Sequence, residues 1–174
     1  MSDQVISDPL EAVICQILRR ERGAGVTRLM KLLYLAELTH FRRYGRPLTG
    51  ARFINYDYGP ICLDAYRALE RLAAKGAIEE HCHTTRDGQT CRLQMPVMTA
   101  MHVEPASPYA IEVVDQVVDE WQDRSSAELV SYAKSTAPFT ASRYNEELDL
   151  SLAAPTPFSS PADVDWDATL PDVI

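Results

Sequence analysis

The side chains best suited to metal chemistry lie in the segment 81–91, HCHTTRDGQTC, where two histidines and two cysteines, the preferred zinc ligands, occur together. Asp87 and Gly88 are a strong signal for a two-residue hairpin turn between two runs of alternating polarity. With that turn, the core face of the predicted hairpin holds Ile78, Cys82, Cys91, Leu93 and Met95, and the solvent face holds Glu79, His81, His83 and Arg92. The cysteines and histidines then cannot converge, so we expect no metal site and no cofactor.

Groups suited to catalysis are sparse. His40 lies near Glu37 on one predicted helix, and Asp57 lies between two tyrosines. A small hydrolase built on His40 would need a nearby serine or cysteine nucleophile, and nothing in the sequence places one there. The chain also lacks a glycine-rich phosphate loop, a nucleophile elbow and a His-Glu-x-x-His helix. We therefore predict a protein that is not an enzyme, with a small hydrolase as an alternative.

A binding site of a different kind is indicated by Tyr56, Asp57, Tyr58, Gly59 and Pro60. Tyrosines offer rigid amphipathic contact area, and a Gly-Pro helix start would present free backbone N–H groups to a partner. Lys31 and Tyr34 lie three residues apart on the preceding helix and so face roughly one way. We predict a groove that binds a partner through these seven residues. The alternative is that Tyr58 only packs over the central helix and bonds within the domain.

Three motifs in this region resemble a known family. They are Lys-Leu-Leu-Tyr at 31–34, Tyr-Gly-Arg-Pro-Leu at 44–48 and Tyr-Asp-Tyr-Gly-Pro at 56–60. In this order they resemble the Panacea family of bacterial and prophage antitoxins, also called SocA-like. The resemblance implies that the chain binds a cognate protein toxin and neutralises it. One branch of the family instead acts as a proteolytic adaptor that delivers its toxin to the ClpXP protease, and the sequence does not choose between these modes.

The elements that must position these residues are mainly helical. Asp8 and Pro9 start a helix that ends near Gly23, with Glu11 as a capping-box partner. The next helix, at about 27–43, has too many apolar residues for one stripe. It is therefore predicted to be buried on most sides and to form the centre of the fold.

Further helices are expected at 60–75, from Ser107, and from Ser125, where Glu128 completes a capping box. Together with the hairpin they predict a mainly α (α+β) fold that is winged-helix-like, with the compact domain spanning residues 8–136.

Charge is distributed unevenly along the chain. Residues 1–100 carry 14 Lys and Arg against 11 Asp and Glu, whereas residues 101–174 carry 3 against 14. Prolines, acidic residues and single apolar side chains predict that residues 137–174 form an acidic tail that is disordered or folds onto a partner. A winged-helix transcriptional regulator is the other alternative, but Lys and Arg on the helix 60–75 and the hairpin are offset by acidic residues, so nucleic-acid binding is not expected.

A chain of 174 residues can bury a core without disulfides, and four cysteines are too few for a disulfide framework. No apolar run approaches the roughly 20 residues that span a bilayer, and the amino terminus lacks the basic flank of a signal peptide. We therefore predict a cytoplasmic protein with reduced thiols and no membrane partner.

Overall fold

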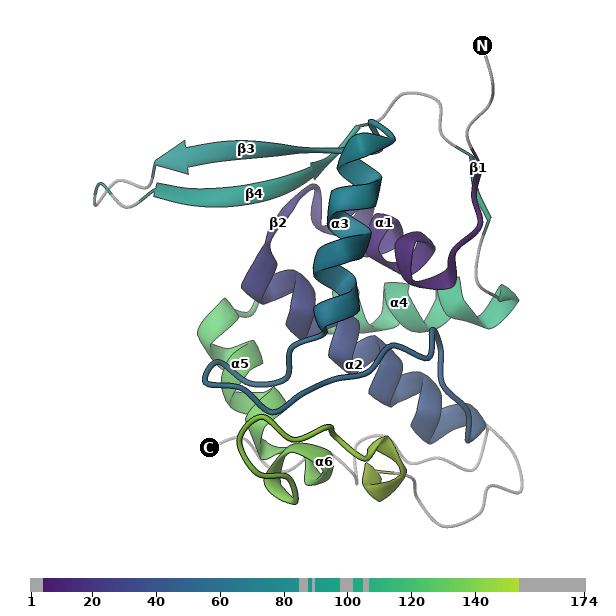
Figure 1. Cartoon of the computed structure of the whole chain (residues 1–174), viewed down its shortest axis with the longest axis vertical. Helices are drawn as coiled ribbons and strands as arrows, with labels where there is room; N and C mark the ends of the chain where they lie inside the picture. The colour runs from purple at the N-terminus through teal and green to yellow at the C-terminus, as the bar shows by residue number, and fades with distance from the viewer. Residues whose placement is uncertain (1–4, 85–87, 89, 98–101, 105–106, 154–174) are drawn as a thin grey trace.

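The computed structural model describes residues 5–84, 88, 90–97, 102–104 and 107–153 (Figure 1). Its helices are α1 (Pro9–Glu21), α2 (Val26–Tyr44), α3 (Leu63–Ala74), α4 (Pro108–Trp121), α5 (Ser126–Ser135), α6 (Ala137–Thr140) and the 3-10 helix η1 (Leu150–Ala153). Its strands are β1 (Val5–Ile6), β2 (Ala24–Gly25), β3 (Ile78–Thr84), β4 (Thr90–Pro96) and β5 (His102–Val103). The predicted mainly α fold with a small antiparallel sheet is confirmed.

Helix α2 lies at the centre of the molecule and contacts α1, α4 and α5 (Figure 1). Its leucines Leu29, Leu32 and Leu33 have no exposed surface, as expected for a helix that is apolar on most sides. The helix ends at Gly45, which adopts a left-handed φ of 65° and donates its N–H to the Phe41 carbonyl at 2.8 Å. The predicted central position is confirmed. Of the described helices, α2 included, none is long and apolar enough to cross a membrane.

Asp8 caps α1 as predicted, because its carboxylate accepts hydrogen bonds from the N–H groups of Leu10 at 2.9 Å and Glu11 at 3.1 Å. The capping-box role predicted for Glu11 is wrong. Glu11 is 1% exposed, and its carboxylate pairs with Arg71 Nε of α3 and with Nζ of Lys75, the residue that caps the end of α3, both at 2.6 Å. A buried carboxylate needs such partners, so Glu11 ties α1 to α3 instead.

The β3–β4 hairpin projects away from the helices, and β2 extends the sheet in the order β2-β4-β3 (Figure 1). The predicted hairpin register is wrong by one residue. Thr84 pairs with Thr90, so five residues rather than two separate the paired strands, and Cys91 pairs with His83. A shift of one residue moves the side chains of a strand to the other face. Cys91 therefore shares a face with His83, and Cys82 is exposed rather than in the core.

The helix predicted from Pro60 begins later, at Leu63, because the residues before it are extended. Ile54 and Ile61 exchange backbone hydrogen bonds of 2.8 and 3.0 Å. The N-cap residue, Cys62, has an extended backbone with φ of −120° and ψ of 111°. The segment that ends at Pro60 is thus a turn followed by a short β-bridge, and it is not the first turn of a helix.

Serines begin α4 and α5 as predicted. Ser107 Oγ accepts the N–H of Ala110 at 3.0 Å. Ser125 Oγ accepts the N–H of Glu128, whose carboxylate accepts the N–H of Ser125 at 2.7 Å. This second arrangement is the expected capping box.

The predicted domain end at residue 136 is too early. Residues 137–153 form α6 and η1, and Phe139 and Leu148 enter the hydrophobic core. Their apolar side chains occur singly, without a helical or strand period, so the sequence offered no pattern for this packing. The rest of the predicted acidic tail, residues 154–174, lies outside the described residues.

Candidate functional site

The predicted binding segment is built on a turn in which the N–H of Gly59 donates to the Tyr56 carbonyl at 2.9 Å. Just before the turn, the N–H of Asn55 donates to the Glu146 carbonyl at 2.9 Å, and the Asn55 carbonyl accepts the N–H of Asn145 at 2.8 Å. These bonds fasten the base of the turn to the loop between α6 and η1.

Lys31 of α2 lies beneath this turn and is 1% exposed. Its Nζ donates to the Pro60 carbonyl at 2.7 Å. Burial, and then the nearby charge of Lys134, lower the pKa of Lys31 to about 8. In the described part of the chain, no carboxylate forms an ion pair with this ammonium group. Its hydrogen bond is made to the backbone of the turn.

Two further features hold the turn in place. Lys134 of α5 donates from Nζ to the Asp57 carbonyl at 3.1 Å. Gly59 has φ of +85°, and a Cβ there would lie 3.1 Å from Lys31 Cε and 3.4 Å from Lys134 Cγ. Glycine is therefore required both by the backbone conformation and by the two lysine side chains that pass close to it.

Tyr34 is fully buried, and its hydroxyl shares a hydrogen bond of 2.7 Å with Thr136 Oγ1. Its ring packs edge-on against Phe53, with 5.3 Å between ring centroids. Burial raises the pKa of Tyr34 to about 12. Tyr34 therefore joins α2 to the junction of α5 and α6.

Tyrosines form the outer surface of the site. Tyr58 is 71% exposed, and Tyr56, at 40%, stacks on Tyr144, at 59%, with ring centroids 5.3 Å apart. A hydrogen bond with Tyr56, then desolvation and the charge of Asp57, raise the pKa of Tyr144 to about 12. Tyr144 was not predicted, because it lies far along the chain in a segment without a motif.

The structure divides the seven predicted residues into two groups. The exposed group is Tyr56, Asp57 and Tyr58, and the buried group is Lys31, Tyr34, Gly59 and Pro60. Lys31 and Tyr34 do share one side of α2, but that side faces inward, so they do not line an open groove. Direct contact between these buried residues and a partner is therefore not supported by their positions.

One family model, described as antitoxin SocA-like, Panacea domain, matches residues 29–138. The chain belongs to this family. The predicted resemblance is thereby confirmed, and the matched region contains both the buried and the exposed groups of the site. Helix α1 and the loop that carries Tyr144 lie outside it. No curated protein and no solved structure matches the chain.

The hairpin of this Panacea-domain chain places His81, His83 and Cys91 on one face, which removes the reason given above for expecting no zinc. In the structure, His81 Nε2 shares a hydrogen bond of 2.8 Å with the Glu79 carboxylate, and Cys91 Sγ donates to the His83 carbonyl at 3.3 Å. Within the described residues, no group of three or more His, Cys, Asp or Glu could hold a metal ion.

His40 and Glu37 are both buried and hydrogen-bond to the loop after α2. His40 is 3% exposed, and its Nδ1 hydrogen-bonds the Arg46 carbonyl at 2.9 Å. Burial lowers the pKa of His40. The Glu37 carboxylate accepts N–H groups of Leu48 at 2.8 Å and Thr49 at 3.1 Å. Both residues therefore support the loop that carries the Tyr-Gly-Arg-Pro-Leu motif of the family.

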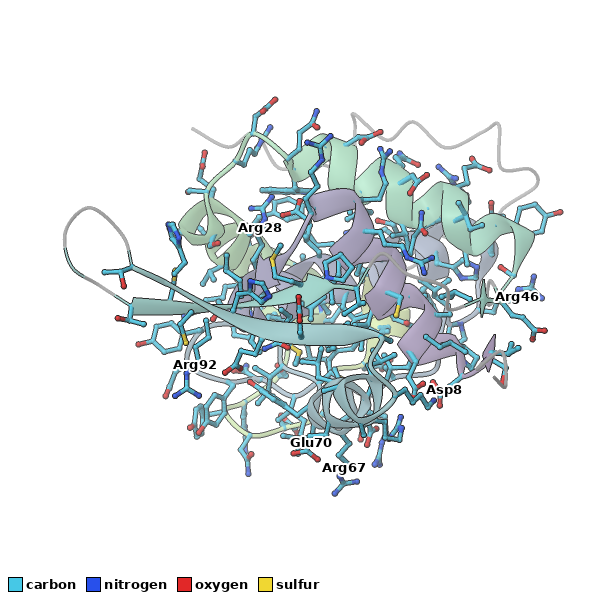
Figure 2. The ribbon with its side chains drawn as sticks, turned by 90° about the horizontal axis from the view of Figure 1, so that it is seen from above. Asp8, Arg28, Arg46, Arg67, Glu70 and Arg92 are labelled. Carbon is cyan, nitrogen blue, oxygen red and sulfur yellow. The ribbon has the colours of Figure 1, made fainter. Side chains whose placement is uncertain are left out.

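The described basic residues of α3 and the hairpin lie beside carboxylates. In the described parts of α3 and the hairpin, acidic partners lie within 3.8 Å of the cations: Asp64 with Arg67, Glu11 with Arg71 and Lys75, and Glu80 with Arg92. Figure 2 shows Arg28, Arg46, Arg67 and Arg92 at separate places around the molecule. The transcriptional-regulator alternative gains no support from this distribution.

Proposed function

We propose that this chain is the antitoxin of a toxin–antitoxin pair and that it neutralises a cognate protein toxin by binding it directly. Membership of the SocA-like antitoxin family supports the antitoxin role. The observation that carries the binding mode is Tyr58, a large aromatic side chain 71% exposed on a turn whose backbone is held by two helices and a loop.

Exposed tyrosines on a rigid backbone suit protein recognition for two reasons. A tyrosine ring covers a large area while losing few rotatable bonds, and it is over-represented among the residues that dominate interface energy. A turn that is already ordered also loses little conformational freedom on binding. In this proposal the toxin contacts Tyr56, Asp57, Tyr58 and Tyr144. Lys31, Tyr34, Gly59 and Pro60 contribute by shaping the surface from beneath.

Neutralisation can follow from covering the toxin or from delivering it to the ClpXP protease. The acidic residues of 154–174 are proposed to add contacts to a basic partner surface in either case. The lifetime of the toxin separates the two modes. Delivery predicts that the toxin disappears faster when the antitoxin is present and that this acceleration requires the protease, whereas covering predicts an unchanged or longer lifetime.

The proposal is tested by expressing the product of the neighbouring reading frame with and without this chain. We expect that product to arrest growth, and we expect the wild-type chain to restore it. Tyr58→Ala should fail to restore growth at equal protein level. Tyr109→Ala is the matched control, because Tyr109 is also exposed, at 48%, but lies on α4. Full restoration of growth by Tyr58→Ala would show that the toxin binds elsewhere on the chain. A neighbouring gene product that does not arrest growth would show that it is not the proposed toxin.

A further inference from the structure

Lysine is rare in this chain. Of its 17 basic residues 14 are arginine, and the lysines are Lys31, Lys75 and Lys134. Lys31 and Lys134 donate to carbonyl oxygens of one turn, those of Pro60 and Asp57. The remaining lysine pairs with buried Glu11 at the other end of α3. Two of three lysines thus converge on the segment that exposes Tyr58.

The chemistry at Pro60 explains why a lysine fits there. Pro60 is buried, and a buried carbonyl needs a hydrogen-bond donor. Lysine brings a compact ammonium group on a slender stem, whereas arginine would bring a wide planar guanidinium. Space is tight, since even a Cβ on Gly59 would lie 3.1 Å from Lys31 Cε.

The position of Lys31 is unfavourable for the core itself. The residue is 1% exposed, and its ammonium group is repelled by Lys134 and has no ion-pair partner among the described residues. A methionine of similar length would fill the same space without a buried charge. Methionine could not donate a hydrogen bond to the Pro60 carbonyl. The property that only lysine provides here is therefore its hydrogen bond to the turn.

We propose that Lys31 is a positioning residue, which holds the Pro60 carbonyl from inside α2 and thereby keeps the Tyr56–Pro60 turn in its binding conformation. Lys134 holds the Asp57 carbonyl of the same turn from α5. The assignment of the turn as a toxin-binding surface rests on the proposed function. The role of the two lysines in holding the turn is independent of that function.

The decisive measurement is hydrogen exchange of the Gly59 and Ile61 amides, which bond to the Tyr56 and Ile54 carbonyls. In Lys31→Met we expect both to exchange about tenfold faster, the effect of losing one hydrogen bond from a charged donor. Amides of α1 should keep their protection, and the melting temperature should not fall. The control is Lys75→Met, which should leave the exchange of both turn amides unchanged.

Unchanged exchange at the Gly59 and Ile61 amides in Lys31→Met would overturn the proposal, as would an equal loss of protection throughout the protein. Should Lys31→Met fail to fold, Lys134→Met decides, because Lys134 is exposed. It should accelerate exchange at Gly59, and no acceleration would overturn the proposal.

Binding of the neighbouring gene product, measured on the same variants, separates this proposal from the proposed function. Faster turn exchange together with about tenfold weaker binding supports both. Faster turn exchange with unchanged binding keeps the positioning role and refutes the turn as the toxin-binding surface. Unchanged turn exchange with weaker binding refutes the positioning role of Lys31 and leaves the binding surface standing.

Discussion

The Tyr56–Pro60 turn and the β3–β4 hairpin both face solvent, but they are held in opposite ways. The turn is fastened by lysines from α2 and α5 and by backbone bonds to the loop after α6. The base of the hairpin contacts α1, α2 and α3, but its outer part is held by its own ladder, because β2 pairs only with Leu93 and Gln94, and Ile78 is the one buried residue of β3. The Tyr56–Pro60 turn, although it projects less than the hairpin, is therefore held by more of the surrounding fold.

Charge separates the two regions in the same way. On the hairpin, Glu80 lies near the Arg92 guanidinium and Glu79 bonds His81, so both carboxylates have partners at the surface. Under the turn, Lys31 is buried with a carbonyl as its partner. On the function proposed above, in which the turn binds the toxin, protrusion is a poor guide to a binding site. A better guide is a surface that the rest of the fold holds in one conformation, even where this places a charge such as that of Lys31 in the core.

The largest effect should come from adding a methyl group under the turn. Gly59→Ala is expected to lower the free energy of unfolding by about 2 to 5 kcal/mol, because a left-handed φ costs an alanine roughly 1–2 kcal/mol and crowding against Lys31 adds a further 1–3 kcal/mol. Gly88→Ala in the hairpin is the matched control. Its φ is +78° with no described atom within 4 Å, so it should cost only the roughly 1–2 kcal/mol of the left-handed backbone. Equal losses in urea denaturation would break the distinction between the two regions.

The next effect is the contribution that Lys31, beneath the turn, makes to the dependence of stability on pH. The pKa of Lys31 is about 8 in the folded protein against 10.5 for an unperturbed lysine. Between these values the Lys31 side chain binds more protons in the unfolded chain, so its contribution to stability should rise with pH from 8 to 10.5, by about 3 kcal/mol. Lys31→Met should lack this rise. Subtracting its curve of unfolding free energy against pH from that of the wild-type protein removes the contributions of the other titrating groups, which the two proteins share. Parallel stability curves for the two proteins would contradict it.

Prediction from sequence succeeded where a pattern is local and failed where partners are distant. The Asp8 cap, the capping box at Ser125 and the apolar α2 each follow from a few neighbouring residues, and all were found. The hairpin register failed because a common two-residue turn was assumed where five residues intervene.

The geometry of the candidate site could be predicted only in part for the same reason. Tyr58 could be identified from its own motif, but the inward direction of Lys31 depends on how α5 packs over α2. Tyr144 stacks on Tyr56 across a large sequence separation and belongs to no motif. A residue whose role is set by a distant partner leaves no signal in a single sequence.

Tyr58→Ala should affect binding and leave folding intact. Because 71% of Tyr58 is exposed, the free energy of unfolding should change little. The affinity for the toxin should fall by about 2 kcal/mol, roughly thirtyfold, as for an aromatic residue at the centre of an interface. Tyr58→Phe keeps the ring and should lose less. The control is His83→Ala on the hairpin, measured by calorimetric titration. The same loss of affinity for the toxin in this variant would show that the interface includes the hairpin.

The smallest effect is expected at the hairpin ion pair. Arg92 Nη1 lies 3.8 Å from the Glu80 carboxylate, and the two side chains are 73% and 46% exposed. Pairs of this kind are screened by water and salt, so Arg92→Ala should change the free energy of unfolding by less than about 0.5 kcal/mol. Lys134→Met, also on the surface but bonded to the turn, should change it comparably little and yet weaken toxin binding. If Arg92→Ala weakens toxin binding as much as Lys134→Met does, the hairpin also contacts the toxin. The proposed difference between the turn, which binds the toxin, and the hairpin, which does not, is then wrong.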